Sequence, residues 1–137
     1  MKLFVVPKTK EYINNLDNII IGLKDFSTNY NVSLIIDEIK ELSKDKNIMV
    51  VINKTIFNDD LEKLEENLIE LSKLNIEAVL FYDLSILSIK NRLNLELNLI
   101  WNQTHMVTNY NTCNYYYNNN VYGAYLSNEK LNSDSVK

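Results

Sequence analysis

The chain has 137 residues, of which 46% are hydrophobic and 23% charged, and its formal net charge is -4. This composition is sufficient for a proper core, and its acidic balance argues against a dedicated nucleic-acid surface, which is usually basic. Cys113 is the single cysteine, which excludes an internal disulfide and any metal or iron–sulfur site built from several thiolates of this chain.

No apolar stretch approaches the roughly 20 residues of a membrane helix. The first apolar run, residues 2–7, is too short for a signal peptide. We therefore expect a cytoplasmic protein that does not enter a membrane, with one domain over residues 1–137. With two glycines and one proline, its loops depend on asparagine for their turns.

Short apolar runs recur along the chain and are predicted to be strands. They cover residues 3–6, 18–23, 48–52, 76–82, 95–101 and 121–126. The run at 48–52 is continuous and rich in β-branched residues, which is typical of a strand buried on both faces of a parallel sheet. Gly22, near the end of the second run, permits a close backbone approach.

Segments with helical spacing separate these runs. Helices are predicted over residues 8–16, 33–44, 58–74, 84–93 and 104–118, and another begins at 128. Ser33 and Asn58 are the expected N-caps of the second and third. The first should turn Tyr12, Ile13 and Leu16 inward. The stripe of the third helix consists of Leu61, Leu64, Leu68, Leu71 and Leu74.

The alternation of strands and helices predicts an α/β fold with a parallel sheet covered by helices. Two architectures fit: a doubly wound sheet of six strands, or part of a (β/α)₈ barrel. Pro7-Lys8-Thr9 has none of the glycines of a dinucleotide fingerprint. The repeat of about 25 residues is typical of barrel units, but periodicity alone leaves both architectures open.

In both architectures ligands bind beyond the carboxyl ends of the strands. Polar residues follow each predicted strand, and each could equally cap a helix. The densest group, from Asn102 to His105, follows the fifth strand and is the best candidate for a site. His105 could act as a base oriented by Asp83, although a rim position in a helix is the favoured interpretation. The candidates after the last four strands are Asn53, Lys54, Asp83, Asn102, Gln103, Thr104, His105, Ser127, Asn128 and Glu129.

Other reactive or aromatic residues are better explained structurally. Cys113 lies inside a predicted helix without an activating cation. Consecutive tyrosines at 115–117 point in different directions on a helix and cannot form one stacking platform. No Walker loop, zinc motif or nucleophile elbow is present, so we expect no cofactor and no metal.

Three segments carry a resemblance to a known family: residues 50–61, 78–87 and 97–111. Their order and spacing, with Gly22 before them and residues 126–129 after them, resemble the U32 (collagenase-like) peptidase family along nearly the whole chain. The resemblance implies a partial TIM-type (β/α)₈ barrel of about six parallel units, with the cysteine- and glycine-containing signature of the family expected downstream of Lys137. Ser85, Asn75 and Asn128 depart from the family pattern.

The resemblance implies a collagenase-like protease, a hydrolase acting on a peptide or small molecule. Asp83 or Glu129 would be its acid/base group, and Asn53, Asn102, Gln103 and His105 would bind substrate. One alternative is a non-catalytic assembly module that pairs through its open barrel edges, as a homodimer or with a partner chain that completes the barrel. Another is an RNA- or quinone-pathway hydroxylation factor of the same family. The net acidity makes nucleic acid the least favoured partner.

Overall fold

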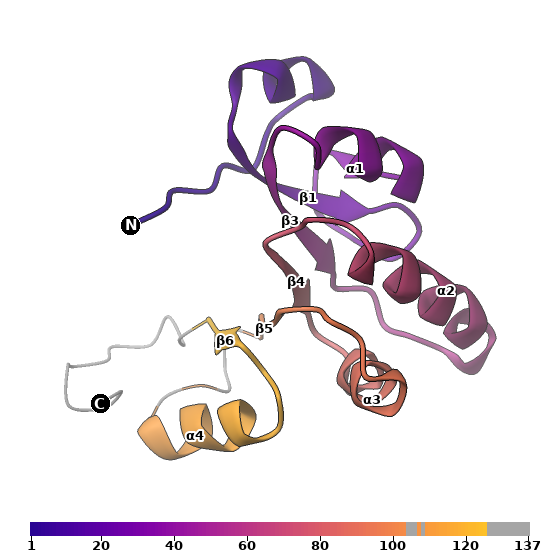
Figure 1. Cartoon of the computed structure of the whole chain (residues 1–137), viewed down its shortest axis with the longest axis vertical. Helices are drawn as coiled ribbons and strands as arrows, with labels where there is room; N and C mark the ends of the chain where they lie inside the picture. Colours follow the sequence, from indigo (N-terminus) through magenta and orange to yellow (C-terminus); the bar gives the residue numbers. More distant parts are fainter. Residues whose placement is uncertain (104–106, 108, 126–137) are drawn as a thin grey trace.

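The computed structural model describes residues 1–103, 107 and 109–125. After the second strand, helices and strands alternate along the chain (Figure 1). No helix in this described part is long and apolar enough to cross a membrane. The elements, with η for a 3₁₀ helix, are η1 (Lys10–Asn15), β1 (Asn18–Leu23), β2 (Ser33–Leu34), α1 (Ile36–Leu42), β3 (Asn47–Ile52), η2 (Asn58–Asp60), α2 (Leu61–Ser72), β4 (Ala78–Phe81), α3 (Leu84–Leu93), β5 (Leu99–Trp101), α4 (Tyr110–Asn118) and β6 (Gly123–Ala124).

The six strands form one sheet in the order β2-β1-β3-β4-β5-β6. Every pairing between neighbours is parallel, which confirms the predicted α/β class. The order is linear, so the described sheet is open, with β2 at one edge and β6 at the other.

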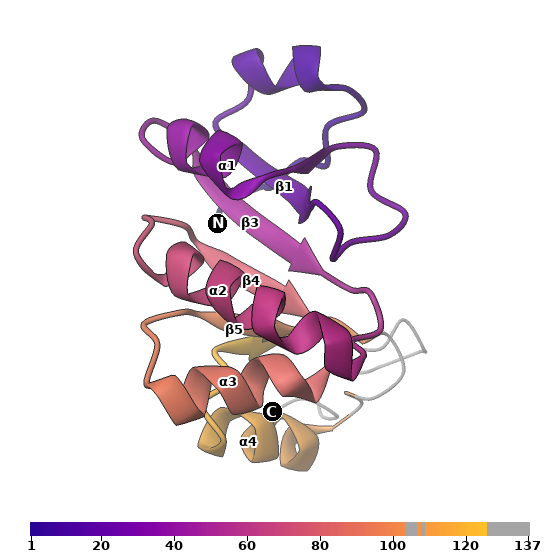
Figure 2. The same cartoon turned by 90° about the vertical axis from the view of Figure 1, so that its right-hand side faces the viewer.

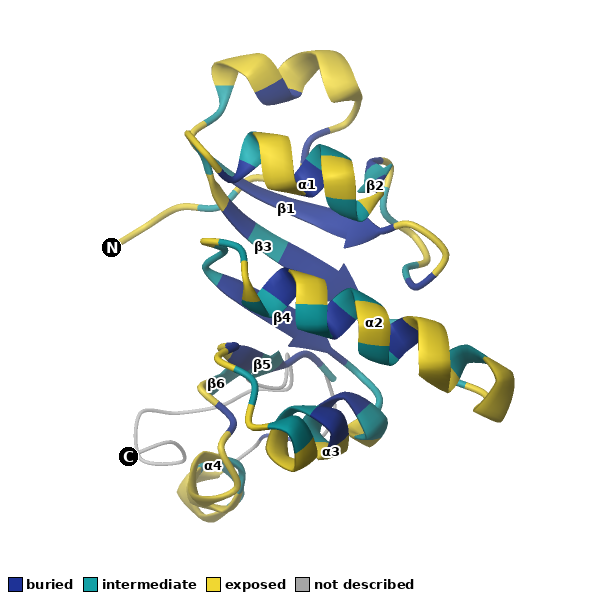
Figure 3. Cartoon of the chain, turned by 45° about the vertical axis from the view of Figure 1, so that its right-hand side comes forward, coloured by how far each residue is buried: buried dark blue, intermediate teal, exposed yellow. Residues whose placement is uncertain are grey.

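The helices cover one face of the sheet. Ile39 of α1, Leu68 of α2 and Ile86 of α3 share a core with alternate strand residues, and Figure 2 shows these helices together in front of the sheet. Figure 3 shows their buried stripes against the strands. We call the opposite face the inner face; it consists of Ile20, Val51 and Leu80, with Phe4, Tyr30, Met49 and Ile100 packed against them.

The placement of the helices on one face decides between the two architectures. Each crossover that contains an α-helix, from β2 to β3 and onward to β6, moves the same way across the sheet, whereas the connection from β1 to β2 moves the opposite way and contains no helix. A doubly wound sheet reverses its direction and so carries helices on both faces. Because the reversed connection carries no helix, all the described α-helices pack on one face. One-sided helices are those of a barrel, and the described units form an incomplete (β/α) barrel.

The amino-terminal predictions are partly wrong. The expected strand at residues 3–6 makes a single bridge, Val5 to Ile19. The helix expected from Ser33 begins at Ile36, because Ser33 and Leu34 form β2 on the same edge of β1. The helix expected at 8–16 is η1, in which Ile13 is buried and Tyr12 is 58% exposed.

The central and carboxy-terminal elements follow the predictions more closely. The long helix begins at Leu61, after the 3₁₀ turn η2, and Asn58 makes no capping bond. Its buried stripe is Leu64, Leu68 and Leu71, while Leu61 lies at the exposed start. The strand expected at 95–101 is confined to β5, because Asn94 ends α3 in a left-handed conformation and Leu95 bonds back to that helix.

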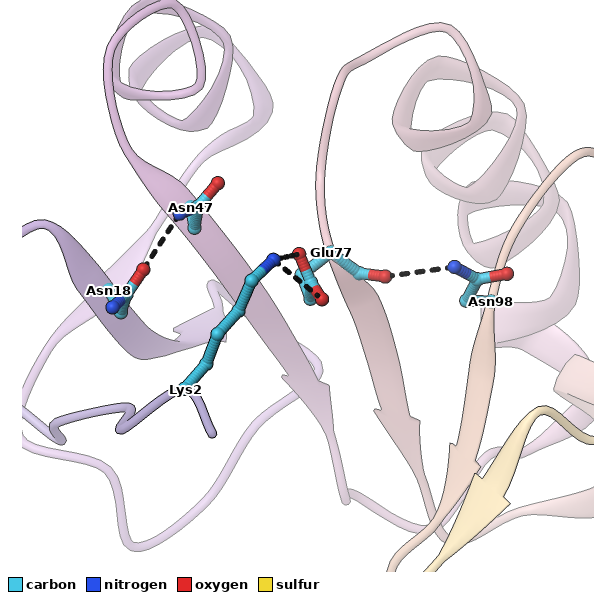
Figure 4. A network of polar contacts seen from close by, with 5 residues as sticks. All are labelled: Lys2, Asn18, Asn47, Glu77 and Asn98. Carbon is cyan, nitrogen blue, oxygen red and sulfur yellow. Dashed lines mark hydrogen bonds and ion pairs between the residues drawn. The ribbon is translucent and has the colours of Figure 1, made fainter.

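The amino ends of the strands are joined by a polar network (Figure 4). Asn47 donates from Nδ2 to Asn18 Oδ1 over 2.7 Å. Asn98 donates to the Glu77 carbonyl oxygen over 3.2 Å, and Lys2 Nζ lies 3.3 Å from Glu77 Oε2. Because Val5 bonds to β1 and Lys2 reaches Glu77 ahead of β4, the amino-terminal segment crosses the inner face at this end. The opposite end, where the strands finish, holds the candidate site.

Candidate functional site

Four polar side chains form a row at the carboxyl ends of the strands. Ile52, Phe81, Trp101 and Ala124 are register partners across β3, β4, β5 and β6, and all four side chains pack in the helix-side core. Strand side chains alternate between the faces, so the residues that follow them face the inner side. We call this set the mouth row: Asn53, Tyr82, Asn102 and Tyr125.

Asn53, predicted to bind substrate, holds the loop between β1 and β2. Its Oδ1 accepts from the Thr28 backbone N–H over 2.7 Å, and its Nδ2 donates to the Thr28 carbonyl oxygen over 3.0 Å. The same loop carries Tyr30, two residues later, onto the inner face. Asn53 therefore shapes the mouth by fixing a loop that contributes to it.

Replacing Asn53 by alanine should lower the free energy of unfolding by about 1 kcal/mol, because both freed Thr28 groups can bond to water instead. The midpoint of urea unfolding measures the change. Asn58→Ala is the matched control, since Asn58 is exposed and its side chain makes no hydrogen bond in the part of the chain that the structure describes. An equal loss in both variants would show that the Thr28 contacts do not matter.

Asp83, the predicted acid/base group, caps α3. Its Oδ1 accepts from the Ser85 backbone N–H over 2.9 Å, and its Oδ2 lies 3.4 Å from the Ile56 backbone nitrogen, in the loop after β3. Both oxygens thus lie next to backbone donors, on the helix side of the strand end. Asp83 borders the mouth through Tyr82, and its catalytic role remains a prediction.

Asn102 and Gln103 follow β5, as expected of the densest polar group. Asn102 is only 8% exposed, and its backbone N–H donates to the Phe81 carbonyl oxygen over 3.0 Å. Its side chain lies near enough to Tyr30 to lower the pKa of that phenol. Gln103 donates from Nε2 to the Tyr82 carbonyl oxygen over 3.1 Å. Two other predicted site residues, His105 and Glu129, lie outside the described residues.

Three tyrosines complete the mouth and were not predicted as site residues. Burial is the main cause that raises the pKa of Tyr30, and the neighbouring phenols of Tyr82 and Tyr125 raise it further, while the nearby Asn102 side chain lowers it. Burial and Tyr82 likewise raise the pKa of Tyr125. The three phenols therefore lie near one another, although they come from distant positions in the chain. Because strand side chains alternate between the two faces, the apolar pattern around Leu80 could have predicted that Tyr82 lies on the inner face. No local sequence pattern predicts the position of Tyr30.

The described residues of the mouth form an uncharged, aromatic surface. Its hydroxyl and amide groups can donate and accept hydrogen bonds, and its rings offer apolar contacts. Within residues 1–103, 107 and 109–125, no group of three or more His, Cys, Asp or Glu side chains could hold a metal ion.

The chain thus has the class of fold of an open (β/α) barrel, with polar side chains at the strand ends, where proteins of this class generally bind their ligands. The family model of Peptidase family U32 matches residues 8–137. The chain is thus a member of the U32 peptidase family, which confirms the resemblance seen in its sequence. No curated protein and no solved structure matches the chain.

Proposed function

We propose that this protein binds peptides at the mouth row, as the substrate-binding part of a U32 peptidase-family domain. The observation that carries the proposal is the pair of Asn102 and Tyr30. A side-chain amide that is 8% exposed lies beside a phenol at the end of the sheet where barrel proteins bind ligands. Such a prearranged polar group in an aromatic setting suits a backbone amide of a substrate.

We further propose that bound peptides are hydrolysed, with Asp83 or Glu129 as the acid/base group. Asparagine caps helices about as well as aspartate. Asp83→Asn therefore removes the charge and keeps the bond to the Ser85 N–H. If Asp83 is the acid/base group, this variant should lose hydrolysis of a capped fluorogenic peptide while its thermal midpoint stays near that of the wild type. Glu129→Gln tests the other candidate in the same way.

Titration calorimetry with acetyl- and amide-capped peptides tests binding. Removal of one neutral hydrogen bond by Asn102→Ala should weaken binding about fivefold, for about 1 kcal/mol. Asn118→Ala, an exposed change on α4, should leave the affinity unchanged. Failure of every capped peptide to bind at millimolar concentration, or equal affinities in both variants, would contradict the proposed function.

The exposed edge next to Val5 supports a second candidate, an assembly module. Leu3, Val5 and Val6 are 72%, 43% and 46% exposed, beside a segment that pairs with β1 through one bridge. Apolar strand edges favour pairing with another chain. Sedimentation at micromolar concentration should then show a dimer that Val5→Lys converts to a monomer; a monomer in both proteins would remove this candidate.

A further inference from the structure

The mouth row has a uniform chemical character that bears on the substrate. Its side chains, together with Tyr30 on the inner face, are phenols and amides without a formal charge. The nearest acidic residue in sequence, Asp83, turns its carboxylate to the backbone N–H of Ser85. In the described part of the chain, the groups that influence the phenols of Tyr30 and Tyr125 are other tyrosines and Asn102, with no charged side chain among them.

The row also has a defined length. It crosses four neighbouring strands, β3 to β6, and strands lie about 4.8 Å apart, so it spans about 14 Å. An extended peptide advances about 3.4 Å per residue and would place about four residues along it. Hydroxyl donors can meet peptide carbonyl oxygens there, and the rings can contact small or apolar side chains.

Resting on the proposed function, we infer that the mouth row selects peptides with an uncharged stretch of about four residues and rejects those with a charge at its centre. A lysine or glutamate side chain of a bound peptide, placed against Asn102, would lose contact with water and would meet no opposite charge among the described residues of the row. Burial of an unpaired charge is strongly unfavourable. The selection therefore arises because the mouth row itself, in the part of the chain that the structure describes, offers no charged partner in a half-buried aromatic surface.

Four capped hexapeptides provide the test. The first is an uncharged parent peptide, and the other three differ from it by a central lysine, a central glutamate or a central glutamine, the last being the uncharged polar control. Affinities are measured by calorimetry with the whole chain. We expect the parent and glutamine peptides to bind with similar affinity. The lysine and glutamate peptides should bind at least about tenfold more weakly. If no peptide binds, the proposed function fails; if all four bind equally, peptide binding stands and the selection is wrong.

Substitutions in the mouth row test whether its residues cause the selection against charged peptides. Tyr82→Phe should weaken binding of the uncharged peptide a few-fold, whereas Tyr117→Phe, at a 73% exposed position on α4, should not. Tyr125→Glu places a carboxylate at a 42% exposed position that can accept it, and should make the lysine peptide bind more tightly than the glutamate peptide. An unchanged order of affinities in a folded Tyr125→Glu protein would overturn the inference.

Discussion

Gly22→Ala should be one of the most damaging single changes in this chain, lowering the free energy of unfolding by about 3 kcal/mol. A Cβ atom at position 22 would lie 2.1 Å from Ser27 Oγ, 2.8 Å from Ser27 Cβ and 2.7 Å from Ser33 Oγ. These serines are bonded to each other over 2.9 Å, and Ser27 Oγ donates to the Leu23 carbonyl oxygen. Relief of the clash must move β2 or the loop that carries Tyr30. Urea unfolding followed by circular dichroism measures the loss.

Gly123→Ala is the matched control. It adds the same methyl group to another strand glycine, where the nearest atom, Ile100 Cγ1, is 3.8 Å away. Neither glycine has a positive φ, so alanine meets no backbone penalty at either position. We expect Gly123→Ala to change stability by less than about 0.5 kcal/mol, and Gly22→Ala with Ser27→Gly to recover part of the loss. Equal destabilisation by both single changes would contradict the steric explanation.

Phe81→Ala should lower the free energy of unfolding by about 4 kcal/mol, a large part of the 5–15 kcal/mol that is typical of a domain. Phe81 is fully buried in β4 and lies between Ile52 and Trp101 in the sheet register. Its ring meets Trp101 edge-on, with centroids 5.1 Å apart. Truncation leaves a cavity beneath α2 and α3 and removes the aromatic contact.

Phe57→Ala removes the same ring from a position that is 65% exposed, and should change stability by less than about 0.5 kcal/mol. Thermal melts of the two variants give the comparison directly. In the Phe81→Ala protein, the fluorescence of Trp101, the single tryptophan, should also change before unfolding begins. Similar melting temperatures for the two variants would mean that the core does not depend on the ring of Phe81.

The predictions from sequence are most accurate where burial is greatest. β3 covers the predicted run at 48–52, because a continuous β-branched run suits only a strand with both faces covered. The leucine and isoleucine spacing likewise identifies α2 and α3, and Asp83 caps α3. Asn29, Asn94 and Asn120 adopt positive φ, as expected of a chain in which asparagine makes the turns.

The least accurate predictions concern elements that exist only through pairing. Residues 3–6 are apolar and extended, yet only Val5 bonds to β1, because β2 occupies the rest of that edge. Ser33 has a side chain typical of a helix cap, but it pairs with the edge of β1 and so belongs to a strand. Neither outcome depends on local propensity, since both depend on which segment returns to the same edge.

The features of the candidate site likewise fall into those that the sequence predicted and those that only the tertiary structure decided. The sequence by itself determined the alternating α/β pattern, the family resemblance, and the expectation that Asn53, Asp83, Asn102 and Gln103 lie at strand ends, because apolar periodicity and its interruptions are local properties. Only the tertiary structure decided that the helices share one face and that Tyr82, Tyr125 and Asn102 lie near enough to Tyr30 to shift its pKa. Strand order and register bring together residues far apart in the chain, and no local pattern records either.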